Sequence, residues 1–196
     1  LIQRQGYLDF LRRNRNRPIV KVVSGIRRCG KSTLFRLFKD ELLSEGVKPE
    51  QIISINFEEL EYEHLREYHA LYQYILERMQ PDEMNYIFLD EIQHVDQFHR
   101  VVDSLFVKEN TDLYITGSNA YFMSSDIATL LTGRYVEIQM LPLSFSEFYH
   151  SKYDGNQYSL IPAYESYLRE SSFPYTQQLG GEDFDIQEYL RGLYNT

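Results

Sequence analysis

The feature that most constrains the fold is the segment 25–32, Gly-Ile-Arg-Arg-Cys-Gly-Lys-Ser, which fits the pattern G-x-x-x-x-G-K-[ST]. A compact, mostly β-branched run at residues 19–23 precedes it, and apolar side chains recur at helical spacing over residues 31–44. The sequence therefore predicts a strand, a tight loop and a helix in direct succession. In that context the backbone N–H groups of the loop and the positive end of the helix face one anion, so we expect the loop to bind phosphate.

The residues of this loop have distinct expected roles in holding ATP. Lys31 would bridge the β- and γ-phosphates as a point charge, and Ser32 would supply a hydroxyl ligand to Mg²⁺. Thr33 would contact the α-phosphate. The residues that we assign to nucleotide binding are Gly25, Ile26, Arg27, Arg28, Cys29, Gly30, Lys31, Ser32 and Thr33.

A second half-site lies in the segment 86–91, Tyr-Ile-Phe-Leu-Asp-Glu, an apolar strand that ends in two carboxylates. The chain turns at the carboxyl edge of such a strand, so Asp90 can reach the Mg²⁺ shell beside Ser32 while Glu91 faces the γ-phosphate. We expect Asp90 to hold the metal and Glu91 to orient and polarise the attacking water. Alone, this pair is equally typical of a helix cap followed by a first-turn acid. The phosphate loop favours the catalytic interpretation.

Polar residues also follow the apolar run at residues 113–116. Thr116, Ser118 and Asn119 are candidates to bond the γ-phosphate or the attacking water, and we favour Ser118 or Asn119. A side-chain cap of the next helix explains any one of them equally well. Arg134 precedes a further strand-like run, and its guanidinium is a candidate to stabilise transition-state charge in the site of a neighbouring subunit. A plain surface role fits this arginine equally well.

Length and composition restrict the class of protein. The chain has 196 residues, enough for one core and a small appended subdomain but too few for two full-sized domains. It has no apolar run of about 18 residues that could span a bilayer and a single cysteine. We therefore expect no secretory leader and a cytoplasmic protein with no membrane partner. The formal charge of −9 argues against a surface covered by nucleic acid.

Strand and helix patterns alternate along the first part of the chain. Strands are expected at residues 19–23, 52–57, 86–89, 113–116 and 135–140, and helices near 31–44, 62–80, 97–106 and 121–131. This alternation predicts an α/β fold, with a five-stranded parallel sheet flanked by helices. After Pro142 the strand patterns cease, which predicts a core at residues 1–143 and a small helical lid at 144–196.

Five segments together resemble a family of bacterial and archaeal predicted ATPases of the AAA+ superfamily. They are residues 25–33, 89–93, 115–119, 131–134 and 141–148. The resemblance covers nearly the whole chain and implies an AAA+-type P-loop ATPase core, followed beyond residue 196 by a C-terminal domain of unknown function. It also implies an arginine finger at Arg134 and a first sensor at Ser118 or Asn119. Arg169 and Arg191 are the candidates for a second sensor, and Tyr7 and residues 17–19 are suited to flank the adenine.

The leading hypothesis is Mg-dependent binding and hydrolysis of ATP, coupled to rearrangement of a protein or nucleic-acid partner. A homo-oligomer is implied if Arg134 acts on a neighbouring subunit. A nucleotide-gated switch or scaffold with slow hydrolysis is the alternative from another class. A small-molecule kinase would share the phosphate loop but would not need Asp90 and Glu91 followed by a polar terminus on a later strand.

Overall fold

The computed structural model describes residues 2, 4–118, 131, 133–153, 159–170, 172–178 and 183–194. The chain divides into two compact units. The sheet unit comprises Gln5–Gly25 and Lys31–Met140, and the helical unit comprises Leu1–Arg4, Ile26–Gly30 and Leu141–Thr196.

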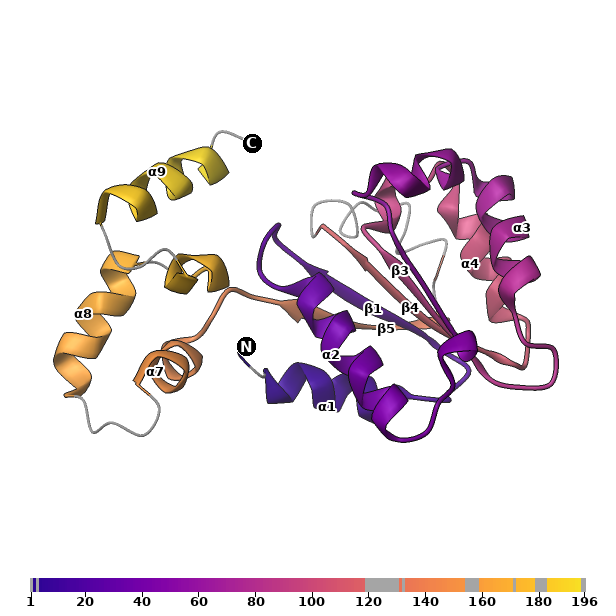
Figure 1. Cartoon of the computed structure of the whole chain (residues 1–196), viewed down its shortest axis with the longest axis horizontal. Coiled ribbons are helices and arrows are strands. Elements are labelled where there is room, and N and C mark those ends of the chain that lie inside the picture. Colours follow the sequence, from indigo (N-terminus) through magenta and orange to yellow (C-terminus); the bar gives the residue numbers. More distant parts are fainter. Residues whose placement is uncertain are drawn as a thin grey trace. The chain divides into compact units, whose positions relative to one another are not determined.

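The sheet unit is built on five parallel strands in the order β2-β3-β4-β1-β5 (Figure 1). They are β1 (Val20–Gly25), β2 (Ile52–Asn56), β3 (Asn85–Asp90), β4 (Thr111–Gly117) and β5 (Tyr135–Met140). The three central strands are buried almost throughout, which is typical of a sheet covered by helices on both sides. The predicted α/β fold with a five-stranded parallel sheet is therefore confirmed.

Helices cover both faces of this sheet (Figure 1). α2 (Lys31–Ser44) packs on one face, where the rings of Phe35 and Phe38 meet those of Phe88 and Tyr114, and α1 (Gln5–Asn14) lies beside it. The other face carries α3 (Tyr68–Arg78) and α4 (Phe98–Phe106), which pack against each other.

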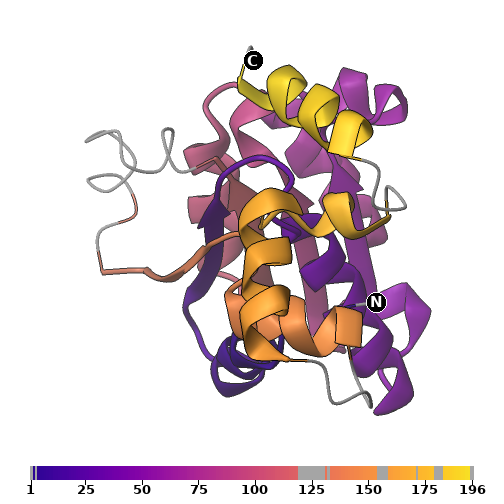
Figure 2. The same ribbon diagram turned by 90° about the vertical axis from the view of Figure 1, so that its left-hand side faces the viewer.

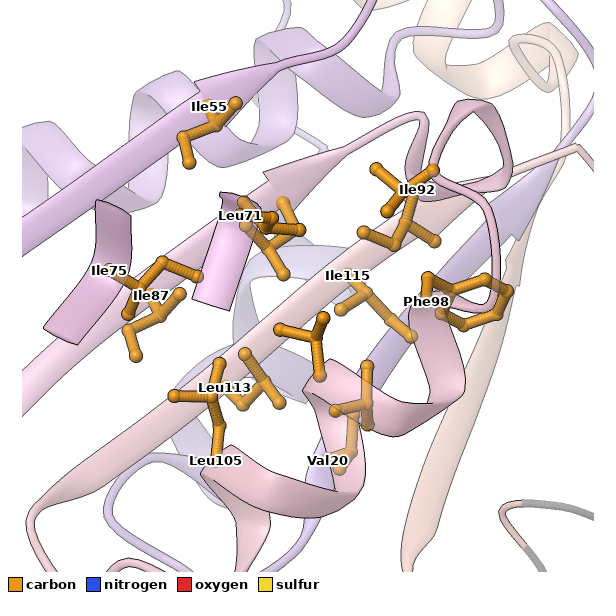
Figure 3. Packing of buried hydrophobic residues seen from close by; sticks show 14 of the residues in the cluster. Val20, Ile55, Leu71, Ile75, Ile87, Ile92, Phe98, Leu105, Leu113 and Ile115 are labelled. Atoms are coloured by element: carbon orange, nitrogen blue, oxygen red, sulfur yellow. The ribbon is translucent and has the colours of Figure 1, made fainter. Parts of the chain in front are cut away.

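The largest hydrophobic cluster lies between α3, α4 and the sheet (Figure 3). Strand residues at every second position face it, because successive side chains of a strand point to opposite sides. Full burial of such a side chain contributes about 1.5–3 kcal/mol. The cluster includes Val20, Ile55, Ile87, Leu113 and Ile115 from strands, and Leu71, Ile75, Phe98 and Leu105 from helices.

A buried ion pair lies near the amino edge of the sheet. Lys21 of β1 and Asp112 of β4 contact each other, and neither side chain has any exposed surface. Lys21 Nζ also donates to the Arg17 carbonyl (2.9 Å). Asp112 Oδ2 accepts from the Asn16 amide (2.8 Å) and the Tyr114 hydroxyl (2.7 Å). The two opposite charges thus neutralise each other and both are hydrogen-bonded.

In its described residues, the helical unit forms three α-helices and a 3-10 helix, drawn in orange to yellow in Figure 2. They are α7 (Phe145–Tyr153), α8 (Leu160–Glu170), η4 (Pro174–Gln178) and α9 (Asp183–Tyr194). α8 packs against α7 and against α9.

A capping box starts α7. The Ser144 amide donates a 2.8 Å hydrogen bond to the Glu147 carboxylate, and the Glu147 amide donates one of 3.2 Å to the Ser144 hydroxyl. The rings of Phe145 and Phe148 then contact Tyr167 of α8. The cap therefore fixes where α7 begins, and the rings fix α7 on α8.

One predicted helix was wrong. The sequence predicts a single helix over residues 62–80, whereas a 3-10 helix, η2 (Leu60–Leu65), precedes α3. The break is at Glu67, whose carboxylate accepts hydrogen bonds from the amides of His69 and Ala70 and so caps α3. The helix cannot run through a residue that has left helical geometry to cap the next one.

The remaining short elements are the 3-10 helices η1 (Pro49–Gln51) and η3 (Ile92–His94). The helix predicted over residues 121–131 lies outside the described residues apart from Leu131. Among the helices that the structure describes, none has both the length and the apolar character needed to cross a membrane.

Candidate functional site

The carboxyl ends of the three central strands lie at one edge of the sheet. Val23 of β1 is level with Thr116 of β4, and Leu89 of β3 is level with Ile115 of β4. The parallel register therefore brings together the residues that end or follow each strand. Open α/β sheets bind their ligands at this edge.

The predicted phosphate loop starts where β1 ends at Gly25 and stops where α2 begins at Lys31. Within it, Arg28 and Gly30 have positive φ angles of 63° and 108°. Left-handed residues in a short turn direct successive backbone N–H groups to one side, which makes a concave anion-binding surface. Cys29, between them, is buried. The backbone of the loop thus suits phosphate.

Lys31 brings its ammonium group into contact with the acidic end of β3. Its Nζ lies 3.0 Å from Glu91 Oε1 and donates a 3.1 Å hydrogen bond to the Gly25 carbonyl. The side chains of Lys31 and Glu91 are only 3% and 7% exposed. The ammonium group therefore joins the start of the loop to the carboxylate that follows β3.

Asp90 ends β3 and accepts hydrogen bonds from two hydroxyl groups, those of Ser32 and Thr116. Burial raises the pKa of Asp90, and the charge of Glu91 adds to this rise, while the two hydroxyls and Lys31 partly offset it. Lys31 thus faces two neighbouring carboxylates, and the charge of Lys39 of α2 also interacts with Asp90. Hydroxyl and carboxylate oxygens are ligands that Mg²⁺ prefers, and Ser32 and Asp90 fit such an ion.

Glu91 has a left-handed backbone, with φ 55° and ψ 50°, which costs a non-glycine residue about 1–3 kcal/mol. Its amide donates a 2.9 Å hydrogen bond to the Thr116 hydroxyl, and its Oε2 accepts one of 2.5 Å from Gln93 Nε2. Since Lys31 contacts the other oxygen, both oxygens of the Glu91 carboxylate have a partner. Gln93 Oε1 is buried and has no hydrogen-bond partner within the described residues.

Comparison with known proteins agrees with this arrangement. Residues 17–149 match the family model described as "AAA domain". The chain belongs to this family. The AAA domain is 42% identical over 176 residues to an uncharacterised protein of Haemophilus influenzae, a match that covers 89% of this chain and 44% of that protein.

A second relative is the uncharacterised protein MJ1544 of Methanocaldococcus jannaschii. It is 30% identical over 191 residues, and the match covers 89% of this chain and 41% of that protein. The chain thus spans less than half the length of these two relatives.

The fold is also similar to that of a solved structure, the Walker-type ATPase of Pyrococcus abyssi. The TM-score is 0.59 at 16% sequence identity, and the match covers 96% of this chain and 71% of that one. These findings confirm the resemblance to AAA+ ATPases.

Arg134 of the AAA domain lies at the amino edge of the sheet. It directly precedes Tyr135, which is level with Val20 at the start of β1. The six residues of β1 span roughly 17 Å at about 3.3 Å per residue, so this guanidinium lies at the other edge from Gly25. It forms a 2.6 Å ion pair with Asp103 of α4. Arg134 is therefore too far from the phosphate loop of its own chain to act there, and a role as an arginine finger would require the site of a neighbouring subunit.

The other predicted residues are placed as follows. Ser118 directly follows β4 and is half-buried, Thr33 is half-buried in α2, and Asn119 lies outside the described residues. Arg169 and Arg191 are exposed on helices of the helical unit. Residues 17–19 line a depression of about 330 Å³ near the amino edge of the sheet, together with Phe106 and Lys108.

Two side chains of this site carry roles that the sequence did not predict. Thr116 was considered as a contact of the γ-phosphate or of the attacking water, but in the AAA domain it bonds Asp90 and the Glu91 amide. Gln93 had no predicted role and holds Glu91. The sequence signal that could have revealed this role is its position, two residues after Glu91 and within the segment 89–93 that resembles the family.

Proposed function

We propose that this AAA domain binds Mg-ATP and hydrolyses it at the carboxyl edge of its sheet. The observation that carries this proposal is the cluster of Lys31, Asp90 and Glu91, in which one ammonium group and two carboxylates gather at the end of the phosphate loop. The left-handed backbone of Glu91 adds support, since such strain gathers at functional sites.

In this proposal the loop and the cluster divide the work of binding. The loop's N–H groups and Lys31 would hold the phosphates, while Ser32 and Asp90 would hold Mg²⁺. The bound ion would neutralise charge on the phosphate oxygens. The repulsion between the Asp90 and Glu91 carboxylates supports this role, because a divalent cation would compensate it.

Hydrolysis would proceed by attack of water on the γ-phosphorus. Glu91 would accept a hydrogen bond from the water and take its proton as the new O–P bond forms. The bond from the γ-phosphorus to the ADP oxygen would break, and the proton would pass to the phosphate that is released. Gln93 would keep the Glu91 carboxylate in place, since it already donates to Oε2.

Further parts of the proposal concern residues and partners around the site. Ser118 or Asn119 would sense the γ-phosphate, and Arg134 would serve the site of a neighbouring subunit in a homo-oligomer. A protein or nucleic-acid partner would receive the energy of hydrolysis. More than half of each relative lies outside the matched part, which leaves room for a region that binds such a partner.

One observation favours a second candidate, a nucleotide-gated switch with slow hydrolysis. Both oxygens of Glu91 are engaged, one by Lys31 and one by Gln93. If Glu91 must break both contacts before it can activate water, hydrolysis would be slow. The bound nucleotide itself, rather than its hydrolysis, would then be the signal to a partner.

Phosphate release and the binding of a fluorescent ATP analogue test both candidates. We expect Lys31→Ala to weaken binding at least 100-fold, by analogy with the loss of a close charge pair, and Glu91→Gln to keep binding but lose about 10²–10⁴-fold in turnover. Lys48→Ala is the control, since Lys48 is exposed, forms an ion pair with Glu83 and lies outside the phosphate loop. Unchanged turnover in Glu91→Gln would contradict the role of Glu91. If the unaltered chain already hydrolyses as slowly as Glu91→Gln, the switch is favoured.

A further inference from the structure

Arg4 is a buried cation of the helical unit that the proposed chemistry does not use. It directly precedes α1 and is only 6% exposed. A buried guanidinium is costly unless its N–H groups have acceptors. Its contacts therefore show which parts of the molecule it serves.

The guanidinium of Arg4 has five N–H groups, and each of its three nitrogens donates to an acceptor in the described part of the chain. Nε and Nη2 donate to the two carboxylate oxygens of Glu147, at 2.8 and 3.1 Å. Nη1 donates to the carbonyls of Leu141 (2.6 Å) and Cys29 (3.3 Å), and Nη2 also donates to that of Pro142 (3.2 Å). A lysine has three donors on one atom and cannot reproduce this fork.

The contact with Cys29 bears on nucleotide binding because Cys29 lies in the phosphate loop. The peptide bond that joins Cys29 to Gly30 is planar and trans, so its carbonyl and the Gly30 N–H point in opposite directions. Gly30 has a φ of 108° and no Cβ, so this peptide could rotate at little cost. By holding the carbonyl, Arg4 fixes the direction of an N–H group that the loop would offer to phosphate.

The contact with Glu147 connects the same guanidinium to α7. Glu147 belongs to the capping box of α7, and its carboxylate accepts from both Arg4 and the Ser144 amide. Burial alone would raise the pKa of Glu147, but the hydrogen bonds from Arg4 and Ser144 outweigh it and lower the pKa. The carboxylate is thus charged near neutral pH and holds Arg4 in place.

We propose that Arg4 is a positioning residue for nucleotide binding, which holds the Cys29–Gly30 peptide in the orientation that offers its N–H to phosphate and anchors it to the cap of α7. This role rests on the proposed binding of ATP to the loop. Since coupling between two sites is reciprocal, nucleotide should also stabilise the packing around α7.

Binding of a fluorescent ATP analogue to Arg4→Lys and Arg4→Met tests this role. We expect the Kd to rise about tenfold, which corresponds to roughly 1.4 kcal/mol, while kcat at saturating ATP changes less than twofold because the contacts of Glu91 are untouched. The Gly30 amide resonance, which ATP should shift in the unaltered chain, should shift less in both variants. Arg4→Lys keeps the ion pair with Glu147, so it is decisive if Arg4→Met does not fold.

Lys152→Met is the matched control, because Lys152 pairs with Glu170 in the same helical unit and, among the described residues, does not contact the phosphate loop. This variant should lower the melting temperature but keep the Kd within twofold. A Kd within twofold of the unaltered chain in the folded Arg4 variants would overturn the positioning role. No analogue binding by the unaltered chain would instead overturn the proposed function and, with it, the basis of this role.

Discussion

The two edges of the sheet handle buried charge differently. Near the amino edge, Lys21 and Asp112 form a closed pair with no exposed side-chain surface. At the carboxyl edge, Lys31 faces both Glu91 and Asp90, and burial raises the pKa of Asp90. Lysine and aspartate thus form a closed pair at one edge, whereas at the other edge two carboxylates lie close enough to repel each other.

Backbone geometry follows the same division. Lys21 and Asp112 lie within regular strands, whereas Glu91 has a left-handed conformation directly after β3. The amino-edge pair also has a cost, because burial lowers the pKa of Lys21, but each of its charges has a counter-charge. The strained Glu91 and its neighbouring carboxylate lower stability in exchange for a ligand. The amino edge therefore serves folding, and the carboxyl edge is the one suited to chemistry.

The largest expected effect comes from replacing one aspartate by asparagine at each edge. Asp112→Asn should lose about 3–5 kcal/mol of unfolding free energy, because it leaves Lys21 buried without a counter-charge. Asp90→Asn should change that free energy by less than about 1 kcal/mol or increase it, because it removes a charge that burial already disfavours. Urea denaturation without nucleotide measures both. Equal losses in the two variants would show that the edges do not differ.

Two threonines of β4 provide a finer comparison. Thr116→Val should cost about 1–3 kcal/mol, because it leaves the buried Glu91 amide without an acceptor, and it should also weaken binding of Mg-ATP. Thr111, at the other end of the strand, donates to the carbonyls of Leu105 and Lys108. Thr111→Val should cost about 0.5–1.5 kcal/mol and leave nucleotide affinity unchanged. The contrast fails if both variants bind Mg-ATP equally well.

The smallest expected effect concerns pH and a carboxylate whose pKa moves opposite to that of Asp90. The pKa of Glu147 is lowered from 4.5, so its stabilising contribution is present above about pH 4.5 and is lost as pH falls through the lowered value. The cost of Arg4→Met should therefore shrink in acid, where the unaltered chain also loses the ion pair. Denaturation at several pH values measures this. A cost that is constant down to about pH 3 would contradict the assignment.

The motifs of the carboxyl edge could be predicted because their signals are local, whereas the pair of Lys21 and Asp112 was not predicted. The phosphate loop and the Asp90-Glu91 pair each lie within a few residues of a strand end, and parallel strands place their carboxyl ends at one edge. The wrong helix over residues 62–80 shows the limit of periodicity, since Glu67 interrupts it through its own side chain.

Other features depend on contacts between distant parts of the chain. Arg4 and Glu147 are 143 residues apart, and no spacing rule connects them. The position of Arg134 at the amino edge likewise follows from the pairing of β5 with β1. Such contacts are set by tertiary packing, which local propensity does not encode.

The place of β1 in the sheet has a consequence for synthesis of the chain. Among the described strands, β1 pairs with β4 and β5. These partners lie roughly 90 to 115 residues further along the chain, and contacts over such separations form slowly. A growing polypeptide therefore carries its phosphate loop on an unpaired strand until β4 has left the ribosome. Nascent chains that end before Thr111 should not retain nucleotide, so retention of nucleotide would report that β1 has paired.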